Sequence, residues 1–456
     1  MTGKQRILHT LQRQPVDRPP WLPFVGCHGG FLINEPADRY LQDADRMVAG
    51  LKEAHRLYRP DALPVAFDLQ IEAEVLGCDL NWAKEVPPSV SSHPLTSRTL
   101  ADLPSLESGA GRIPLVLEVL DRTRAELGDG TALYGLVCGP FTLALHLRGN
   151  EIFLDMFDDE QQVKDLIDFA ADRAGEMAGF YLDHGADVIA VVDPMTSQIS
   201  PAHFNDFVAP ALNKLFDAIR RRNAYSSLFV CGDVTRNLEA MCQTRADNLS
   251  VDEQIDMSTL KALAAAHDKS FGGNIKLTSV LLLGTPDDAQ REAVAIMDQC
   301  ADAPFILAPG CDLPYATPPE NLAAVAEVVH DAYRREVVRA AGHAVAHDAF
   351  EDVSVPDYDA AEAVILDVIT LDSTSCAPCQ YMMEAVQRAA AATAVRTYVN
   401  EHKIKVREGI GMMQKLGVKN LPTICIDGDV AFASIIPDQR TLVAAIEKRA
   451  QEKHAP

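Results

Sequence analysis

Short apolar runs alternate with amphipathic, helix-like stretches from the N-terminus to about residue 345. Most of these runs are continuous rather than alternately apolar and polar, which is typical of parallel strands covered on both faces. They lie at 20–26, 62–68, 131–138, 186–193, 226–233, 248–252, 271–275 and 304–309. Eight strand units separated by helices favour a (β/α)8 TIM barrel over an open doubly wound sheet, so the predicted class is α/β.

Helical periodicity fills the intervals between the apolar runs. The clearest examples are residues 114–126, 161–184, 201–222 and 318–340. Most of them open on or just after a proline or a polar residue, as helices often do.

The pattern changes after residue 342. Residues 343–359 are polar and acidic and contain a proline, which predicts a linker. The pattern of residues 360–456 predicts a small second α/β domain. Its expected elements, in chain order, are a strand at 363–370, a helix through Ala392, a strand at 395–399, a helix at 406–416, a strand at 421–426, a hairpin turn at Asp427-Gly428, a strand at 430–435 and a helix at 440–449. The predicted domains are therefore a barrel at 1–342, the linker and this smaller domain.

Chain length, net charge and apolar content limit the number of domains and the kinds of partner that this protein can have. A chain of 456 residues is too long for one ordinary domain. The formal net charge of −24 argues against a nucleic-acid or anionic-membrane partner, since both would be repelled. No apolar run approaches the roughly 20 residues of a membrane span, and the N-terminus has no apolar signal core. We therefore expect a cytoplasmic protein; an oligomer is compatible with the sequence, but no feature specifies one.

Two cysteines far apart in the sequence suggest a site on the barrel. Cys231 and Cys311 each follow an apolar run and adjoin a glycine at the expected C-terminal end of a strand. If both strands belong to one parallel barrel, both thiols face the rim where barrel enzymes keep their chemistry. Two thiolates on one rim suggest a soft-metal site, with zinc as the first candidate.

The second domain carries a C-x-x-C motif, Cys376 to Cys379, between a predicted strand and helix. The first cysteine would sit at the helix N-terminus, where unpaired N–H groups favour the thiolate, with the second as resolving thiol. With Leu421-Pro422-Thr423 downstream, whose proline bond we expect to be cis, the pattern resembles the thioredoxin-like fold. The resemblance implies dithiol–disulfide exchange at the motif. The alternative is a thioredoxin-like module used only for docking or dimerisation.

The barrel carries a series of short motifs at 13–20, 67–77, 139–144, Asp193-Pro194, 199–201, 207–210, 231–233, 273–275, 284–286 and 309–311. In their order along the chain they resemble the uroporphyrinogen decarboxylase superfamily, and more closely its corrinoid-dependent methyltransferase branch. The decarboxylases carry an Arg-Gln-Ala-Gly-Arg run after the first strand, and residues 24–30 contain no arginine here, which argues against decarboxylation of a polyacid. The resemblance implies methyl transfer between a corrinoid, free or protein-bound, and a small thiol or folate.

The same resemblance implies a zinc site. Its expected ligands are a His-x-Cys on the fifth strand, a cysteine after the eighth, and an acidic residue between them. Two positions fall on Cys231 and Cys311, and the acidic one on Glu253. The histidine position holds Phe229, which cannot coordinate a metal. His28 is a candidate replacement, as are Cys27 and Cys138, and a different metal or a metal-free pair of thiols also stays open.

Further polar residues are expected near the rim. Asp68 and Glu72, with His28, are the predicted cofactor-binding residues, although Asp68 alternatively caps the next helix. Asp193 ends the fourth strand and is a predicted catalytic acid, the alternative being a turn aspartate before proline. Asn274 is expected to face a ligand, with a tight turn as the alternative.

Two functions follow from these features. In the first, a methyltransferase uses a metal–thiolate site on the barrel rim and a corrinoid as methyl donor or acceptor. In the second, the barrel binds a small molecule and Cys376 and Cys379 perform thiol–disulfide exchange. Phe229 favours the second function, because it removes a ligand from the predicted metal site.

Overall fold

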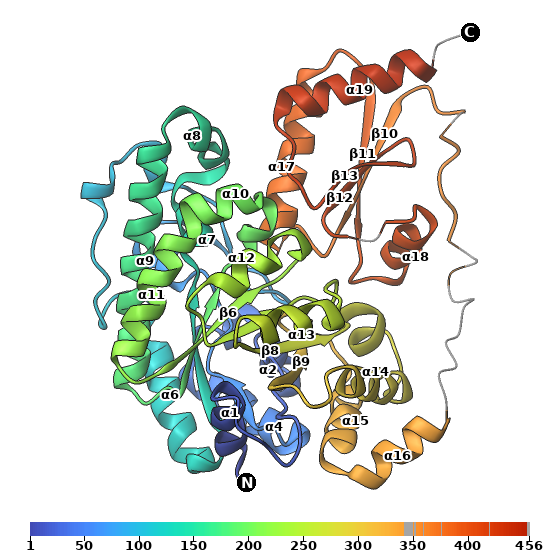
Figure 1. Ribbon diagram of the computed structural model, residues 1–456. Helices are drawn as coiled ribbons and strands as arrows, with labels where there is room; N and C mark the ends of the chain where they lie inside the picture. Colours follow the sequence, from blue (N-terminus) through green and yellow to red (C-terminus); the bar gives the residue numbers. More distant parts are fainter. Residues whose placement is uncertain (342–349, 351–352, 359, 375, 419, 454–456) are drawn as a thin grey trace. The chain divides into compact units, whose positions relative to one another are not determined.

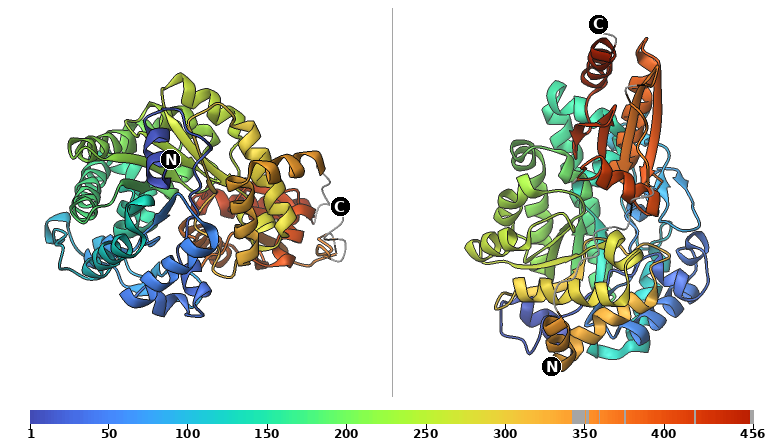
Figure 2. Two further views of the ribbon diagram at one scale, coloured as in Figure 1. Left: turned by 90° about the horizontal axis from the view of Figure 1, so that it is seen from below. Right: turned by 90° about the vertical axis from the view of Figure 1, so that its right-hand side faces the viewer.

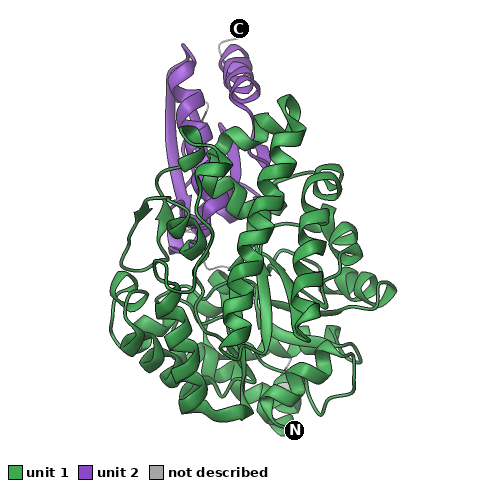
Figure 3. Ribbon diagram, turned by 90° about the vertical axis from the view of Figure 1, so that its left-hand side faces the viewer, with its two compact units in different colours: residues 1–343 green, residues 344–456 purple. Residues whose placement is uncertain are grey.

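The computed structural model describes residues 1–341, 350, 353–358, 360–374, 376–418 and 420–453. The chain divides into two compact units, residues 1–343 and 344–456 (Figure 3). Most of the predicted linker at 343–359 lies outside the described residues. Two of its described residues pack within the C-terminal unit, Val353 in an apolar cluster and Tyr358 through a 2.8 Å hydrogen bond to Asp367.

The N-terminal unit is built on a parallel sheet that curls into a barrel (Figure 1). Its strands, in sheet order, are β1 (Ala62–Pro64), β4 (Ala132–Cys138), β5 (Val188–Val192), β6 (Tyr225–Val230), β7 (Asn248–Val251), β8 (Ser270–Ile275) and β9 (Phe305–Pro309). Nearly every residue of these strands is buried, which is why they are continuous apolar runs in the sequence. Seven of the predicted parallel strands are thereby confirmed.

The first predicted strand, 20–26, is instead a short bridging segment. Leu22 N donates to Leu307 O at 2.9 Å, and Leu307 N donates to Pro20 O at 2.9 Å. On its other side, Asp61 N donates to Trp21 O at 2.8 Å. The segment thus joins β9 to the start of β1 and closes the sheet. Proline has no N–H to donate, so a longer hydrogen-bond ladder cannot form here.

A buried carboxylate stabilises this closure. Asp61 accepts from Arg6 Nη1 at 2.5 Å and from Arg18 Nη1 at 2.6 Å. It also accepts from the backbone N–H of Trp21 at 2.8 Å. The Asp61 side chain is only 4% exposed, so two arginines and one amide compensate a charge that water does not reach. We call Asp61, Arg6 and Arg18 the closure cluster.

Helices surround the strands of this unit (Figures 1 and 2). The longer ones are α4 (Ala44–Tyr58), α6 (Ile113–Leu127), α7 (Pro140–Arg148), α9 (Glu160–Asp183), α11 (Ala209–Arg221), α13 (Met257–Ala266), α14 (Pro286–Gln299), α15 (Pro319–His330) and α16 (Ala332–Ala341). Short helices are α2 (His28–Leu32), α3 (Ala37–Tyr40), α5 (Ile71–Val75), α8 (Ile152–Asp158), α10 (Pro201–His203) and α12 (Leu238–Gln243), and a small hairpin pairs β2 (Leu80–Asn81) with β3 (Ser89–Val90). Among the helices that the structure describes, none is long and apolar enough to cross a membrane.

Two predicted helices are interrupted. The stretch at 201–222 consists of α10, a π-helical turn at Phe204–Val208, and α11. Pro210, which has no N–H, lies just beyond the widened turn. The stretch at 318–340 divides into α15 and α16 at Asp331, whose backbone is extended. The apolar periodicity predicted both segments as helical, but it did not show these breaks.

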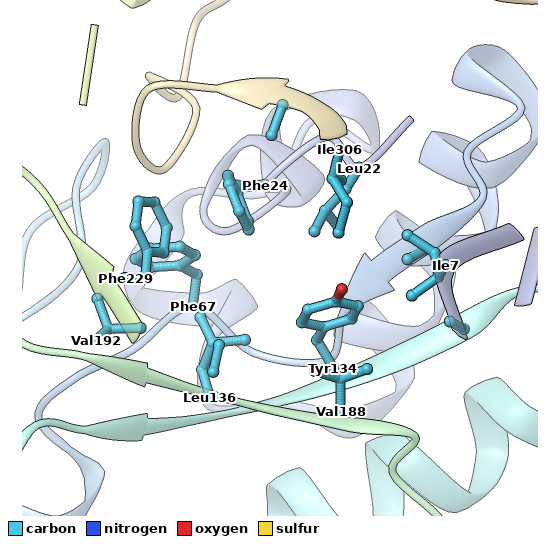
Figure 4. Close-up of a cluster of buried hydrophobic side chains, with 14 of the residues drawn as sticks. Ile7, Leu22, Phe24, Phe67, Tyr134, Leu136, Val188, Val192, Phe229 and Ile306 are labelled. Carbon is cyan, nitrogen blue, oxygen red and sulfur yellow. The ribbon is translucent and has the colours of Figure 1, made fainter. Parts of the chain in front are cut away.

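The barrel interior is filled with side chains from both ends (Figure 4). At the N-terminal end, α1 (Gly3–Leu11) inserts Ile7 and Leu11 among the strands. At the other end, Phe229 stacks on Phe24 with ring centroids 4.6 Å apart and meets Phe67 edge-on at 5.9 Å. Cys231 and Cys311 pack against this cluster, so the aromatic rings form the floor beneath the two cysteines.

The C-terminal unit follows the predicted order of elements. These are β10 (Val364–Thr370), α17 (Ala377–Ala392), β11 (Thr397–Lys403), α18 (Arg407–Lys415), β12 (Thr423–Ile426), β13 (Asp429–Ala433) and α19 (Gln439–Lys453). The sheet order is β11-β10-β12-β13, with β10 parallel to β11 and the other pairs antiparallel. The Leu421–Pro422 bond is cis, as predicted. Asp427 and Gly428 have positive φ angles of 45° and 85°, which suits the predicted two-residue hairpin turn.

We expect Asp61→Asn to lower the free energy of unfolding of the barrel by about 3 kcal/mol, because the buried Arg6 and the partly buried Arg18 lose the carboxylate that they share, and Arg6 keeps only the more exposed Asp17. Urea titration followed by tryptophan fluorescence reports this unit, since the chain's two tryptophans, Trp21 and Trp82, both lie in it. The matched control is Asp129→Asn, an aspartate 87% exposed and 3.9 Å from Lys4, which should cost less than about 0.5 kcal/mol. Equal losses in the two variants would contradict a stabilising closure cluster.

Candidate functional site

The centre of the candidate site is a pair of bonded cysteines at the barrel rim. Cys231 directly follows β6, and Cys311 lies two residues beyond β9. The two form a disulfide with their Cα atoms 5.8 Å apart. Because β7 and β8 separate β6 from β9 in the sheet, the bond links loops from non-adjacent strands. The prediction that both sulfurs lie on the same rim is therefore confirmed.

The loop after β7 fills the space between the two cysteine loops. Asp252 accepts from Gly232 N, beside Cys231, at 2.9 Å. A Cβ on Gly310, beside Cys311, would lie 2.5 Å from Glu253 N, so this position requires glycine. The loop therefore touches the neighbours of both cysteines.

Asn274 fixes this loop from the next strand. Its Nδ2 donates to Asp252 O at 3.0 Å and to Ile255 O at 2.8 Å. The amide is buried, and the Gly273–Asn274 peptide bond is cis. Asn274 was expected to face a ligand, whereas in the structure its amide holds the loop that carries Glu253.

Glu253 places a titratable carboxyl group at the rim. Its Oε2 accepts from the Leu277 N–H, at the end of the following strand. Burial and the neighbouring charge of Asp252 raise the pKa of Glu253 to about 8. A carboxyl group whose pKa is near neutral is suited to accept or return a proton at working pH.

The predicted zinc ligands do not form a metal site in this arrangement. The two sulfurs are bonded to each other. Within the described parts of the chain, no three His, Cys, Asp or Glu side chains are grouped so that they could hold a metal ion. Phe229, at the expected histidine position, is fully buried in the aromatic cluster.

His28 does not replace the missing histidine. Its Nε2 lies 2.7 Å from the Tyr58 hydroxyl and its Nδ1 lies 2.9 Å from Tyr315 O. Burial lowers the pKa of His28 to about 4, so the ring is neutral at pH 7. Both nitrogens are engaged, which leaves neither one for a metal or a corrinoid in this structure. The side chain instead connects α2 to the end of α4 and to the loop after β9. The other two candidate replacements, Cys27 and Cys138, are buried.

Asp193 acts as a helix cap in this structure. Its Oδ1 accepts from Thr142 N at 2.8 Å and its Oδ2 from Phe141 N at 3.1 Å, both in the first turn of α7. Gly139 leaves room for it, since a Cβ there would lie 2.2 Å from Asp193 Cβ. Burial raises the pKa of Asp193 to about 6. The expected catalytic acid is thus fully buried and directed at the start of a helix.

Asp68 and Glu72 are also engaged with the scaffold. Asp68 accepts from Gln70 N at 2.9 Å, just before α5, but Gln70 is the N-cap residue and α5 has no side-chain cap, so Asp68 does not cap this helix. It also accepts from Arg112 Nη1 at 2.5 Å, and Arg112 Nε donates to Glu74 at 2.7 Å. Glu72 accepts from Cys138 N at 2.9 Å, and burial raises its pKa to about 7. Both predicted cofactor-binding acids are buried beside the strands rather than open at the rim.

Sequence reasoning missed Asp312 and Arg112. Asp312 directly follows Cys311 in the sequence. Its side chain lies against Gly26, where a Cβ would be 2.4 Å from Asp312 Oδ1. Its position directly after Cys311 was an available signal. Arg112 joins Asp68 to Glu74 from the start of α6, and no local pattern in the sequence indicates that pairing.

The C-x-x-C motif opens α17 of the C-terminal unit, as predicted. Cys376 is the N-cap residue and is partly exposed, whereas Cys379 is buried, and both are thiols. The hydrogen bond with the Cys379 thiol and burial raise the pKa of Cys376 above its ordinary value. The Cys379 backbone N–H and the charge of Lys405 act in the opposite direction. The expected thiolate-stabilising groups are thus present, but the paired thiol outweighs them in the reduced motif.

Comparison with known proteins covers mainly the N-terminal unit. The uroporphyrinogen decarboxylase (URO-D) family matches residues 2–332. Methylcobamide:CoM methyltransferase MtbA of Methanosarcina acetivorans is 29% identical over 340 residues, which are 72% of this chain and 97% of that protein. Uroporphyrinogen decarboxylase of Nostoc punctiforme is 24% identical over 332 residues, 70% of this chain and 93% of that one.

A solved structure shows the same relationship. A methyltransferase from Methanosarcina mazei superposes with a TM-score of 0.68 at 26% sequence identity. The match covers 73% of this chain and 99% of that chain. The family match ends at residue 332, so the C-terminal unit lies outside it.

We expect the contribution of Glu72 to barrel stability to fall as pH rises from about 4.5 to 7, because native Glu72 holds a proton that the unfolded chain releases. The raised pKa corresponds to about 3 kcal/mol over this window. Glu72→Gln keeps the acceptor for Cys138 N but does not titrate. The free energy of unfolding of this variant, minus that of the wild type, should therefore increase with pH, as measured by urea titration.

Glu118→Gln on α6 is the matched control, since Glu118 is 55% exposed at its side chain. Its difference from the wild type should stay flat over the same pH range. A flat difference for Glu72→Gln as well would show that the buried carboxyl group does not titrate in this window.

Proposed function

This chain belongs to the uroporphyrinogen decarboxylase (URO-D) family, and we propose that it is a methyltransferase that moves a methyl group from a corrinoid to a small thiol. It is an enzyme of that family related to the methylcobamide:CoM methyltransferases MtbA and MtaA. The observation that carries the proposal is the pair Cys231 and Cys311 at the rim of a barrel that spans 97% of the length of MtbA.

The finer description of the fold is part of this proposal. Counting the bridging segment at 20–22 as the eighth strand gives a (β/α)8 barrel for residues 1–342. The order β-α-β-α-β-β-α and the sheet order of the C-terminal unit support a thioredoxin-like domain at 360–456. Residues 343–359 are then the linker.

The chemistry requires a thiolate and a methyl group held in line. A thiol acceptor must lose its proton, and the sulfur then attacks the methyl carbon while the electron pair of the carbon–cobalt bond stays on the corrinoid. Burial raises the pKa of Glu253 to about 8, so the group is largely protonated at pH 7, and it is the ionised form at the rim that can take that proton. Asn274 holds the Glu253 loop in place through two backbone carbonyls. Glu253 is thus the proposed proton acceptor, and Asn274 its positioning residue.

The two rim cysteines contribute to this reaction only when they are reduced. As a disulfide they carry no thiolate, so we propose that Cys231 and Cys311 act as a dithiol beside the acceptor sulfur. Zinc bound to the reduced pair, with Glu253 as a further ligand, stays a prediction. The replacement of the expected histidine by Phe229 makes such a site weak, because only two sulfurs and one carboxyl group remain as donors.

Decarboxylation of a polyacid is disfavoured by the residues in and beside the segment 24–30. Asp312 lies against Gly26 in that segment, and the segment itself contains no arginine. An acidic side chain at this point repels substrate carboxylates rather than binding them. The structure therefore gives no cationic group where the resemblance to decarboxylases requires one.

We expect Cys231→Ala and Cys311→Ala each to lower methyl transfer at least about 100-fold, the scale of loss when one group of a catalytic set is removed. The assay uses the reduced full chain with methylcobalamin as donor and coenzyme M as acceptor, and follows loss of methylcobalamin absorbance. Cys242→Ala, at a buried cysteine of α12, is the control and should retain activity. Full activity in both rim variants would rule out this role for the pair.

We expect Phe229→His to raise the zinc affinity of the reduced protein at least about tenfold, because it adds a nitrogen ligand to the two sulfurs. Competition with a chromophoric chelator measures the affinity. The matched control is Phe67→His, which changes a ring 5.9 Å from Phe229 but does not create the His-x-Cys spacing. Similar affinities for the two variants would mean that Cys231 and Cys311 do not form the core of a zinc site.

A further inference from the structure

The exposure of the cysteines divides them into two groups. The chain has ten cysteines, and the structure describes all of them. Seven are buried, namely Cys27, Cys78, Cys138, Cys242, Cys300, Cys379 and Cys425. The three that are partly exposed are Cys231 and Cys311, which form the disulfide, and Cys376, the first cysteine of the C-x-x-C motif.

Thiol–disulfide exchange requires this combination. A thiolate must reach a disulfide sulfur, and a second thiol must then resolve the mixed disulfide. The chain offers one accessible disulfide, at the barrel rim, and one accessible thiol, Cys376. Its neighbour Cys379 is buried within hydrogen-bond reach of Cys376, which suits a resolving thiol.

We propose that the Cys376/Cys379 dithiol reduces the Cys231–Cys311 disulfide of its own chain, so that the protein contains its own thiol–disulfide oxidoreductase activity. The Cys376 thiolate attacks one rim sulfur, and the sulfur–sulfur bond of the rim breaks. A mixed disulfide forms and the other rim cysteine leaves as a thiolate, which takes up a proton. The Cys379 thiolate then attacks Cys376, which releases the second rim thiol.

The step balances without an external reductant. One disulfide is consumed at Cys231–Cys311 and one is formed at Cys376–Cys379. Two electrons pass from the C-terminal pair to the rim pair, and the two protons released by the C-terminal thiols are taken up by the rim thiols. The number of disulfides per chain therefore stays at one throughout.

Charged side chains lie near both cysteine pairs. Lys405 acts on Cys376 in the direction of the thiolate, as does the backbone N–H of Cys379 at the start of α17. The rim pair is flanked by the acidic residues Asp252 and Asp312. Lys405 also pairs with Asp372 at 3.4 Å, and the hydrogen bond with the Cys379 thiol keeps the pKa of Cys376 raised in the reduced motif.

The consequence for methyl transfer rests on the proposed function, whereas the exchange itself does not. If the reduced rim pair is the catalytic form, the exchange converts an inactive barrel into an active one. The Phe229 ring fits this view, because it fills the place of a third metal ligand and leaves two sulfurs that can bond to each other. The C-terminal unit lies outside the family match, and in this proposal it supplies the electrons that reduce the rim disulfide of the barrel.

Cys379→Ser in the full chain tests the proposal, since removal of the resolving thiol arrests exchange at the mixed disulfide. After air oxidation, alkylation and digestion without reductant, mass spectrometry should find Cys376 linked to Cys231 or Cys311. In Cys376→Ser the link should be absent and the rim disulfide intact. Cys425→Ser, at a buried cysteine of the same unit, is the matched control and should behave as the wild type. An intact rim disulfide and an alkylated Cys376 in Cys379→Ser would overturn the proposal.

Kinetics in the full-length wild type provide the second measurement. Stopping exchange by acid and counting labelled rim thiols should give a rate that does not change over a 100-fold range of protein concentration. A rate proportional to concentration would place the exchange between chains and overturn the intrachain proposal. Methyl transfer is assayed separately on protein reduced with a phosphine, so that loss of either activity is seen independently of the other.

Discussion

Closure of the barrel at Asp61 is the constraint on which the rest of the structure depends. The segment at Pro20–Leu22 joins β9 to β1 with few hydrogen bonds, because proline cannot donate to a longer ladder. The buried Asp61 carboxylate adds bonds to two arginines and to the Trp21 amide at the same place. With the sheet closed there, the C-terminal ends of β6 and β9 meet over one rim, which brings Cys231 and Cys311 together.

Most of the acidic residues near the strand ends stabilise the scaffold. Asp193 caps α7, Asp68 binds both the start of α5 and Arg112, and Glu72 binds the Cys138 amide. A buried carboxylate without such donors would be costly, so these groups are held by amides and a guanidinium. Glu253 differs, since it lies at the rim beside the cysteine loops and its raised pKa suits proton transfer. The proposed chemistry is thus assigned to one loop and one pair of sulfurs.

The residue at position 229 bears on whether Cys231 and Cys311 are thiols or a disulfide. Phe229 stacks on Phe24 where the family resemblance suggested a histidine, so this position supplies no imidazole. Two thiols without a third strong ligand are free to bond to each other, as the structure shows. Under the proposed function, the barrel requires a source of electrons before its thiols can act. The same chain carries a dithiol with one accessible and one buried cysteine.

The sequence alone determined the order of elements and the rim position of the two cysteines. Continuous apolar runs indicate buried parallel strands, and strand ends in one barrel share a rim, so these conclusions needed only local patterns. The motif Cys376 to Cys379 at a helix start and the cis bond before Pro422 followed in the same way. Tertiary structure decided what each polar side chain binds. Asp193 and His28 appeared available for chemistry, but their partners, Thr142 and Tyr315, lie 51 and 287 residues away. Hydrogen bonds over such separations depend on how strands and loops pack, which no local pattern in the chain records.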